Sequence, residues 1–374
     1  MPACSSIKCQ AIHKRKDFSD HTMNKQHRGF KIAIAIVAVL VIASGLGYVN
    51  RGALAAWGFD MFLSKKVEAK LADSYQPLED RPAPSEAPAV TEPFALLLMG
   101  VDARPGELAG RSDTLIYTVV RPQDGNVLMI SIPRDAYADI VGKNKKDKIT
   151  HAYAYGGPEM AVNSVEKLLD AHIDHYASIN FEGFVQVVDT LGGIPLPITE
   201  DIVNKGADHE KFTIKANQES YSGEEALDYV RYREDAGGDV ARTERNRVFL
   251  ESIIHKASSL NEWDKIPELL GIAGDNFRTD LPPSSLTDLA KQFLQTDHRI
   301  QSYTLKGTGA RMGKSNLWYM VLDEEDLANV RQTIAAWLNP STPEPQLTTP
   351  GAKAEANGGT NAAYSANATD ALAS

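Results

Sequence analysis

Arginine and aspartate meet at the ends of three apolar runs in this chain. The pairs are Asp102 with Arg104, Arg111 with Asp113, and Arg134 with Asp135. Arginine is suited to hold phosphate through two parallel hydrogen bonds. Mg²⁺ prefers one or two carboxylates together with phosphate oxygens. These residue types therefore predict a site in which Asp102 and Asp113 bind Mg²⁺ (or Mn²⁺) and arginines surround a pyrophosphate.

The three apolar runs are expected to be buried strands. They are FALLLMGVD (94–102), LIYTVV (115–120) and NVLMISI (126–132), and the RPQDG between the last two has turn chemistry. If these two strands pair antiparallel, the turn lies at one end of the hairpin and both Arg/Asp pairs lie at the other. The sequence thus predicts a hairpin that brings Asp113 and Arg134 to one place.

Further candidates follow downstream. YVRYR supplies Arg231 and Arg233, and a predicted helix over 239–260 carries Asp239, Arg242 and Asn246. Offsets of three and seven residues put the last three on one helix face, near an N-terminus that favours an anion. The alternative is that each Arg or Asp forms a surface ion pair of ~0 to 1 kcal/mol. A shared anion explains the whole set better, because so many neighbouring arginines would otherwise repel one another.

Helical and strand patterns alternate through the rest of the chain. Apolar stripes predict helices from Pro158 to 169 and over 181–191, 222–233, 239–260, 284–295 and 323–338, and further strands over 175–180, 299–305 and 317–322. This mixture predicts a three-layer α/β/α sandwich with a mixed central sheet. Asp170, His172, Asp174 and His175 are interpreted as a polar junction between a helix and a strand rather than a metal site.

The N-terminal part predicts a membrane anchor. The chain has 374 residues and a net charge of −10, yet residues 1–31 hold seven basic and two acidic side chains. Residues 32–49 then carry no charge, so a transmembrane helix is expected over 32–50, with a cytoplasmic N-terminus and the rest outside the cell membrane. The alternative is a cleaved secretory signal ending near Ala53-Leu54-Ala55. Both alternatives export the same domain.

The exported part divides by composition. Residues 51–92 are rich in Pro and Ala and predict a stalk, residues 93–338 a folded domain, and residues 339–374 a disordered tail of low complexity. Cys4 and Cys9, the only cysteines, lie in the basic tail, so no disulfide is expected in the exported domain. No Walker A loop, Gly-x-Ser-x-Gly elbow or His-Glu-x-x-His motif occurs.

Several segments together resemble the LytR-CpsA-Psr family of membrane-anchored bacterial proteins. They are LLLMGVDAR, RSDTLIYTVV, SIPRD, KITHAYAYGG, GGIP, YVRYRED and DVARTERN, in the order of the family. The resemblance implies a phosphotransferase that moves a glycopolymer, such as teichoic acid or capsular polysaccharide, from an undecaprenyl-pyrophosphate carrier to peptidoglycan.

The resemblance also implies roles for individual residues. Asp102 and Asp113 resemble the family's magnesium ligands, and Asp239 resembles an aspartate that helps activate the acceptor hydroxyl. Arg134 is expected to be catalytic as well as to bind the pyrophosphate. The arginines that resemble the family's pyrophosphate contacts are Arg111, Arg134, Arg231, Arg233 and Arg242. Asn246 stands where the family commonly has Gln, and its shorter reach puts a direct phosphate contact there in doubt.

Two other functions stay open from the sequence. A polyprenyl-pyrophosphate phosphatase would use the same residues with water as the acceptor. A non-catalytic, wall-associated regulatory or binding protein is the other. Direct binding of nucleic acid is not expected, because the exported domain is acidic and has no recognisable helix-turn-helix.

Overall fold

The computed structural model describes residues 72–351, with the exception of 80, 82–90, 103–109, 207–210, 233, 235–237, 260–268, 270–271, 273–275 and 296–298. The chain separates into two units, residues 1–61 and 62–374, and every described residue belongs to the second. The predicted transmembrane helix over 32–50 lies outside the described residues. Within them, no helix has the length and apolar character needed to cross a membrane.

A six-stranded mixed sheet forms the centre of the domain, in the order β10-β3-β2-β1-β6-β9. Its strands are β1 (Phe94–Asp102), β2 (Arg111–Arg121), β3 (Asn126–Ile132), β6 (His175–Asn180), β9 (Phe277–Thr279) and β10 (Arg299–Thr304). Neighbours pair antiparallel except for β1 with β6 and β3 with β10. The predicted mixed sheet is confirmed.

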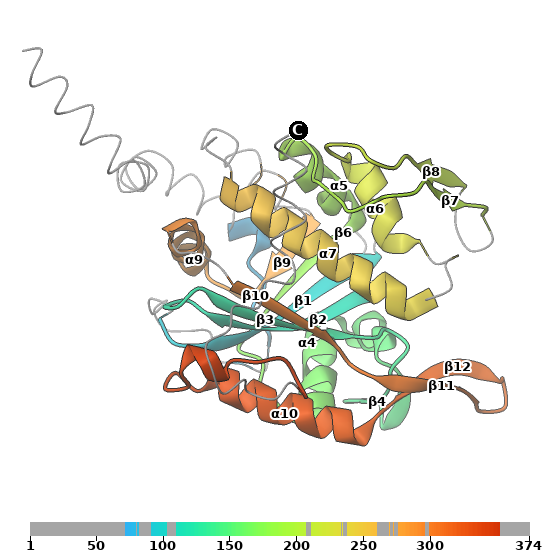
Figure 1. Cartoon of the computed structure of the whole chain (residues 1–374). Helices are drawn as coiled ribbons and strands as arrows, with labels where there is room; N and C mark the ends of the chain where they lie inside the picture. The colour runs from blue at the N-terminus through green and yellow to red at the C-terminus, as the bar shows by residue number, and fades with distance from the viewer. Residues whose placement is uncertain are drawn as a thin grey trace, which may run out of the picture. The chain divides into compact units, whose positions relative to one another are not determined.

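Helices cover both faces of this sheet (Figure 1). One face carries α4 (Thr150–Leu169) and α10 (Glu324–Leu338). The other carries α5 (Phe181–Thr190), α6 (Gly223–Arg231), α7 (Gly238–Ser259) and α9 (Pro283–Gln295). The arrangement is the expected α/β sandwich.

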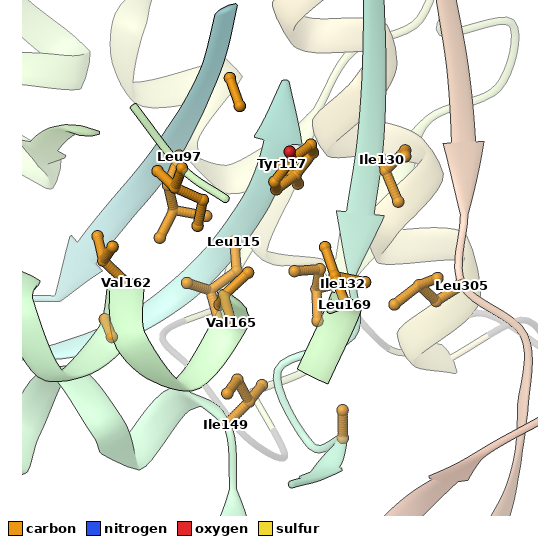
Figure 2. Packing of buried hydrophobic residues seen from close by; sticks show 14 of the residues in the cluster. Leu97, Leu115, Tyr117, Ile130, Ile132, Ile149, Val162, Val165, Leu169 and Leu305 are labelled. Carbon is orange, nitrogen blue, oxygen red and sulfur yellow. The ribbon is translucent and has the colours of Figure 1, made fainter. Parts of the chain in front are cut away.

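The main core lies between the sheet and α4. Leu97, Tyr117 and Ile130 from three adjacent strands pack with Val162 and Val165 of the helix, and all five are almost completely buried (Figure 2). A smaller apolar cluster on the opposite face contains Ile116, Val127 and Met129, with Leu250 of α7 packed against it. Both faces of the central strands are therefore buried, which explains their nearly continuous apolar sequence.

Three two-stranded hairpins lie outside the central sheet. They are β4 (Tyr137–Ile140) with β5 (Lys145–Lys148), β7 (Ile202–Asn204) with β8 (Phe212–Ile214), and β11 (Gly307–Met312) with β12 (Leu317–Leu322). Of these six strands, the sequence predicted β12 alone, because the others are short or polar and lack a clear alternation.

The folded body extends beyond the predicted range 93–338 at both ends. Before it, η1 (Ala72–Ser74) is followed by Gln76, whose amide donates to the carbonyl of Thr279 at 2.7 Å, and by the buried Leu78. After it, η3 (Glu344–Gln346) leads to Leu347, which is also buried. These contacts could not be predicted from composition, because both segments are polar and rich in Pro and pack against the domain through single apolar residues.

Candidate active site

The carboxyl ends of four strands lie at one edge of the sheet. Asp102, the last residue of β1, is the cross-strand partner of Arg111, the first residue of β2. The strands β1, β3, β6 and β10 all run toward this edge, as their pairings require. In α/β folds, ligands commonly bind beyond the carboxyl ends of such strands. We call this edge of the sheet the arginine edge.

A β-bulge displaces Asp113 from the regular ladder. Gly100 pairs with Thr114 and Val101 with Ser112, so Asp113 stands between them with no residue opposite it on β1. Bulges turn a side chain away from the direction the regular pleat would give it. The Nη1 atom of Arg134 donates a hydrogen bond to Oδ1 of Asp113 at 2.8 Å. The predicted hairpin therefore does bring Asp113 and Arg134 together.

The backbone around Arg134 is tied to the start of α4. The Thr150 amide donates to the carbonyl of Arg134 at 3.2 Å, and the Thr150 hydroxyl donates to the carbonyl of Ser112 at 2.9 Å. Arg134 Nε lies 3.6 Å from Oδ2 of Asp135, whose Oδ1 pairs with the Lys148 ammonium. One threonine thus links the beginning of β2 to the segment after β3, and so fixes Arg134 and Asp113 relative to each other.

The helix α7 is held against the same edge. The amide Nδ2 of Asn246 donates to Oγ1 of Thr114 at 3.1 Å, and Asn246 is buried. Asp239 and Arg242 lie in the first two turns of α7, but their side chains, and Arg233 as a whole, fall outside the described residues. The pyrophosphate contacts of Arg233 and Arg242 and the catalytic role of Asp239 stay predictions.

Arg231 reaches this region from α6, which begins with the predicted capping box of Ser222 and Glu225. Its guanidinium lies 5.1 Å from the ring centroid of Phe181. Phe181 directly follows Asn180, the residue of β6 that pairs with Val101 next to the end of β1. The ring contact thus places Arg231 close to the arginine edge.

Arg245 was not singled out from the sequence. It is buried, its Nη2 donates to the carbonyl of Tyr232, and its guanidinium lies 5.2 Å from the Tyr232 ring centroid. It therefore holds the segment that joins α6 to α7. The signal was present, because Arg245 follows Arg242 by three residues in the same helix.

The carboxylates at this edge are suited to a divalent cation. Asp102 is exposed at the end of β1, and Asp113 is held by Arg134 at its Oδ1 atom. In the part of the chain that the structure describes, no three His, Cys, Asp or Glu side chains form a metal-binding group. Two carboxylates beside arginines match Mg²⁺, which completes its shell with phosphate oxygens and water.

Known proteins are similar to this chain in sequence and in fold. The sequence model of the LytR_cpsA_psr family matches residues 61–336. The polyisoprenyl-teichoic acid–peptidoglycan teichoic acid transferase TagU of Halalkalibacterium halodurans is 34% identical over 308 residues, covering 80% of this chain and 98% of that protein.

Solved structures agree with the sequence comparison. The crystal structure of B. subtilis TagV aligns with a TM-score of 0.57 and 31% identity, covering 66% of this chain and 98% of that one. The structure of TagT bound to LIIa-WTA aligns with a TM-score of 0.56 and 27% identity, covering 71% and 99%. The resemblance predicted from the motifs is confirmed, and this chain belongs to the LytR_cpsA_psr family.

Proposed function

We propose that this chain is a phosphotransferase that attaches a cell wall glycopolymer, of the teichoic acid or capsular polysaccharide type, to peptidoglycan. The donor is the polymer on an undecaprenyl-pyrophosphate carrier. The ion pair between Asp113 and Arg134, beside Asp102 and Arg111, is the observation that carries this proposal. The name of TagU, a polyisoprenyl-teichoic acid–peptidoglycan teichoic acid transferase, supports the same donor and acceptor.

The reaction is an in-line displacement at phosphorus. A sugar hydroxyl of peptidoglycan attacks the phosphorus nearest the glycopolymer, and a new oxygen–phosphorus bond forms. The bond from that phosphorus to the bridging oxygen breaks, and the carrier leaves as its monophosphate. Asp239 accepts the proton of the attacking hydroxyl. The fixed guanidinium of Arg134 stabilises the negative charge that develops on the phosphate oxygens.

The remaining residues bind and orient the pyrophosphate. Arg111, Arg231, Arg233 and Arg242 hold its oxygens, while Asn246 keeps α7 in place through Thr114. Asp102 and Asp113 would hold Mg²⁺, which neutralises phosphate charge. The anchor predicted over 32–50 keeps the domain at the outer surface of the cell membrane, where a lipid-linked donor resides.

A transfer assay with the full chain in detergent tests this proposal. A polyprenyl-pyrophosphate donor with a labelled glycan is mixed with peptidoglycan oligomers, in Mg²⁺ or in EDTA. We expect label joined to peptidoglycan in Mg²⁺ and none in EDTA. Cleavage of the donor without attachment would establish a phosphatase instead. No reaction of the donor in either condition would refute catalysis and favour a binding protein.

A further inference from the structure

Two of the outer hairpins lie directly beside the arginine edge. The amide of Met320 in β12 donates to the carbonyl of Asp135 at 2.8 Å, one residue after Arg134. The rings of Tyr137 in β4 and Tyr319 in β12 meet edge to face, with centroids 5.1 Å apart. The hairpins β4–β5 and β11–β12 therefore form one continuous surface, which we call the hairpin surface; both lie at the same end of the sheet (Figure 1).

This surface is basic in an acidic protein. The hairpin β4–β5, residues 137–148, contains four lysines and two aspartates, and the segment 306–322 contains Lys306, Arg311 and Lys314 with no acidic residue. One of the aspartates, Asp139, lies 3.9 Å from the Lys146 ammonium, so the net positive charge of this hairpin is two. The whole chain has a net charge of −10. A concentration of positive charge in so acidic a chain indicates a surface that meets an anionic partner.

Aromatic rings are interleaved with the lysines. The ammonium of Lys145 lies 4.3 Å from the centroid of Tyr155, and that of Lys146 lies 5.8 Å from the centroid of Tyr137. A Cβ at Gly309 would lie 1.8 Å from the indole of Trp318, so the missing side chain lets the indole lie across β11. Trp318 is nevertheless 45% exposed. Flat, exposed rings of this kind stack on the apolar faces of sugars.

Asp147 fixes the lysines and rings in place. Its Oδ2 accepts hydrogen bonds from Lys145 at 3.0 Å and from the Tyr155 hydroxyl at 2.9 Å, and its Oδ1 lies 3.1 Å from Nδ1 of His151. Burial opposes ionisation of Asp147, but these hydrogen bonds lower its pKa to about 2. The surface is therefore organised before any ligand arrives, which reduces the ordering cost of binding.

We propose that the hairpin surface binds the phosphate-bearing glycan chain of the donor, outward from the pyrophosphate at the arginine edge. Lysines of the segment 143–148 contact the chain phosphates, and Trp318 and Tyr155 stack on its sugars. The ion pair of Lys148 with Asp135, the residue after Arg134, places the hairpin surface next to the arginine edge. This inference rests on the proposed function, because it assigns the part of the donor beyond the reacting phosphates.

Binding of a soluble polymer tests the hairpin surface separately from catalysis. The probe is a fluorescent glycerol-phosphate oligomer, and the protein is the full chain in detergent. The variant K143Q/K145Q/K146Q removes three charges and keeps a polar, unbranched side chain at each position. If the triple variant folds poorly, K143Q/K146Q is used in its place, because it leaves the contact between Lys145 and Asp147 intact. The matched control, K205Q/K211Q/K215Q, removes three exposed lysines around the hairpin β7–β8.

We expect the triple variant to bind about tenfold more weakly, because exposed charge contacts contribute modestly but add up over three sites. The control should keep the wild-type affinity, and neutral dextran should not compete. Equal affinity of the triple variant and the wild type would overturn the inference, as would equal loss in the control. Transfer of a single-sugar donor by the wild type is measured in parallel. If that transfer proceeds while the oligomer does not bind, the hairpin surface is refuted and the proposed function stands.

Discussion

The strand β2 has an arginine at each end, and the two are placed in opposite ways. Arg121 is 5% exposed, and its guanidinium donates to Asp124 at 2.8 Å and to the carbonyls of Trp337 and Asn339 at 2.8 and 3.0 Å. Arg111 is exposed and lies opposite Asp102. The first arginine is engaged by fixed protein groups and holds the fold. The second presents its donors to solvent, where an anion can reach them.

Other polar groups near Arg121, at the far end of the sheet, are also engaged by fixed protein groups. There Oδ2 of Asp174 accepts from the amide of Ala95, and Glu166 accepts from both Arg81 and the amide of Ile173. The polar residues at 170–175 thus join a helix to a strand, as their sequence suggested. The burial and the partners of an arginine, rather than its position at a strand end, therefore separate a structural role from ligand binding.

The largest expected effect is the loss of transfer in Arg134→Ala. Removal of a fixed charge that stabilises the developing phosphate charge should lower kcat by about 10²- to 10³-fold. The folded state should lose only ~0 to 1 kcal/mol, because the pair with Asp113 is partly exposed. Single-turnover transfer and thermal unfolding of the full chain measure the two quantities. Full activity in this variant would remove Arg134 from the mechanism.

At the other end of β2, Arg121→Ala should act on stability. It leaves the carbonyls of Trp337 and Asn339 without their buried donor, at a cost of about 2–3 kcal/mol in the free energy of unfolding. Below its unfolding transition, the variant should transfer at close to the wild-type rate. A stable but inactive Arg121→Ala protein would contradict the structural role of Arg121, because it would give this residue and Arg134 the same role.

A smaller effect is expected for Asn246→Ala, because Asn246 is buried like Arg121 but lies at the arginine edge like Arg111. Loss of its hydrogen bond to Thr114 should cost about 1 kcal/mol of stability. Transfer should fall several-fold through a shift of α7, with KM for the donor rising more than kcat falls. If KM is unchanged and kcat collapses, Asn246 acts on the reacting phosphate itself.

The smallest effect concerns Asp147, a carboxylate near the arginine edge with a structural role. Because its pKa is lowered from 3.8 to about 2, the ionised form stabilises the fold above pH 3.8 and that stability is lost as the pH falls toward 2. The wild type should therefore lose about 1 kcal/mol more than Asp147→Asn over this interval, with allowance for solvent screening. Denaturant unfolding at pH 4 and pH 2 measures the difference. Parallel pH profiles for both proteins would contradict the assigned role.

The long apolar elements could be predicted from the sequence. The strand β1 begins and ends at the predicted residues, because a continuous apolar run bounded by Pro93 and by the polar residues after Asp102 leaves little ambiguity. The helix α4 is divided by Gly156 and Gly157, whose angles are not helical; its second part starts at the predicted Pro158, and the sequence did not reveal the first part from Thr150. The strand β5, KKDK, has no apolar alternation to reveal it.

The site could be predicted in its residue types but not in its details. The turn at 121–125 was sufficient to bring Asp113 and Arg134 together. The bulge at Asp113 has no local signal, because it depends on the register of two strands. The role of Arg245 could not be foreseen, because its contacts with Tyr232 depend on the tertiary arrangement of α6 and α7. The packing of Leu78 and Leu347 could not be foreseen, because it depends on the folded surface that receives them.

The most direct test of the different roles of Arg111 and Arg121 is a binding measurement with geranyl pyrophosphate. The full chain in detergent is titrated calorimetrically in the presence of Mg²⁺, as wild type, Arg111→Ala and Arg121→Lys, below the unfolding transition of each. We predict that Arg111→Ala weakens binding by about tenfold or more, as expected for a lost charge-assisted contact, and that Arg121→Lys leaves it unchanged. Equal affinity of the wild type and Arg111→Ala would contradict the assignment of the arginine edge as the pyrophosphate site.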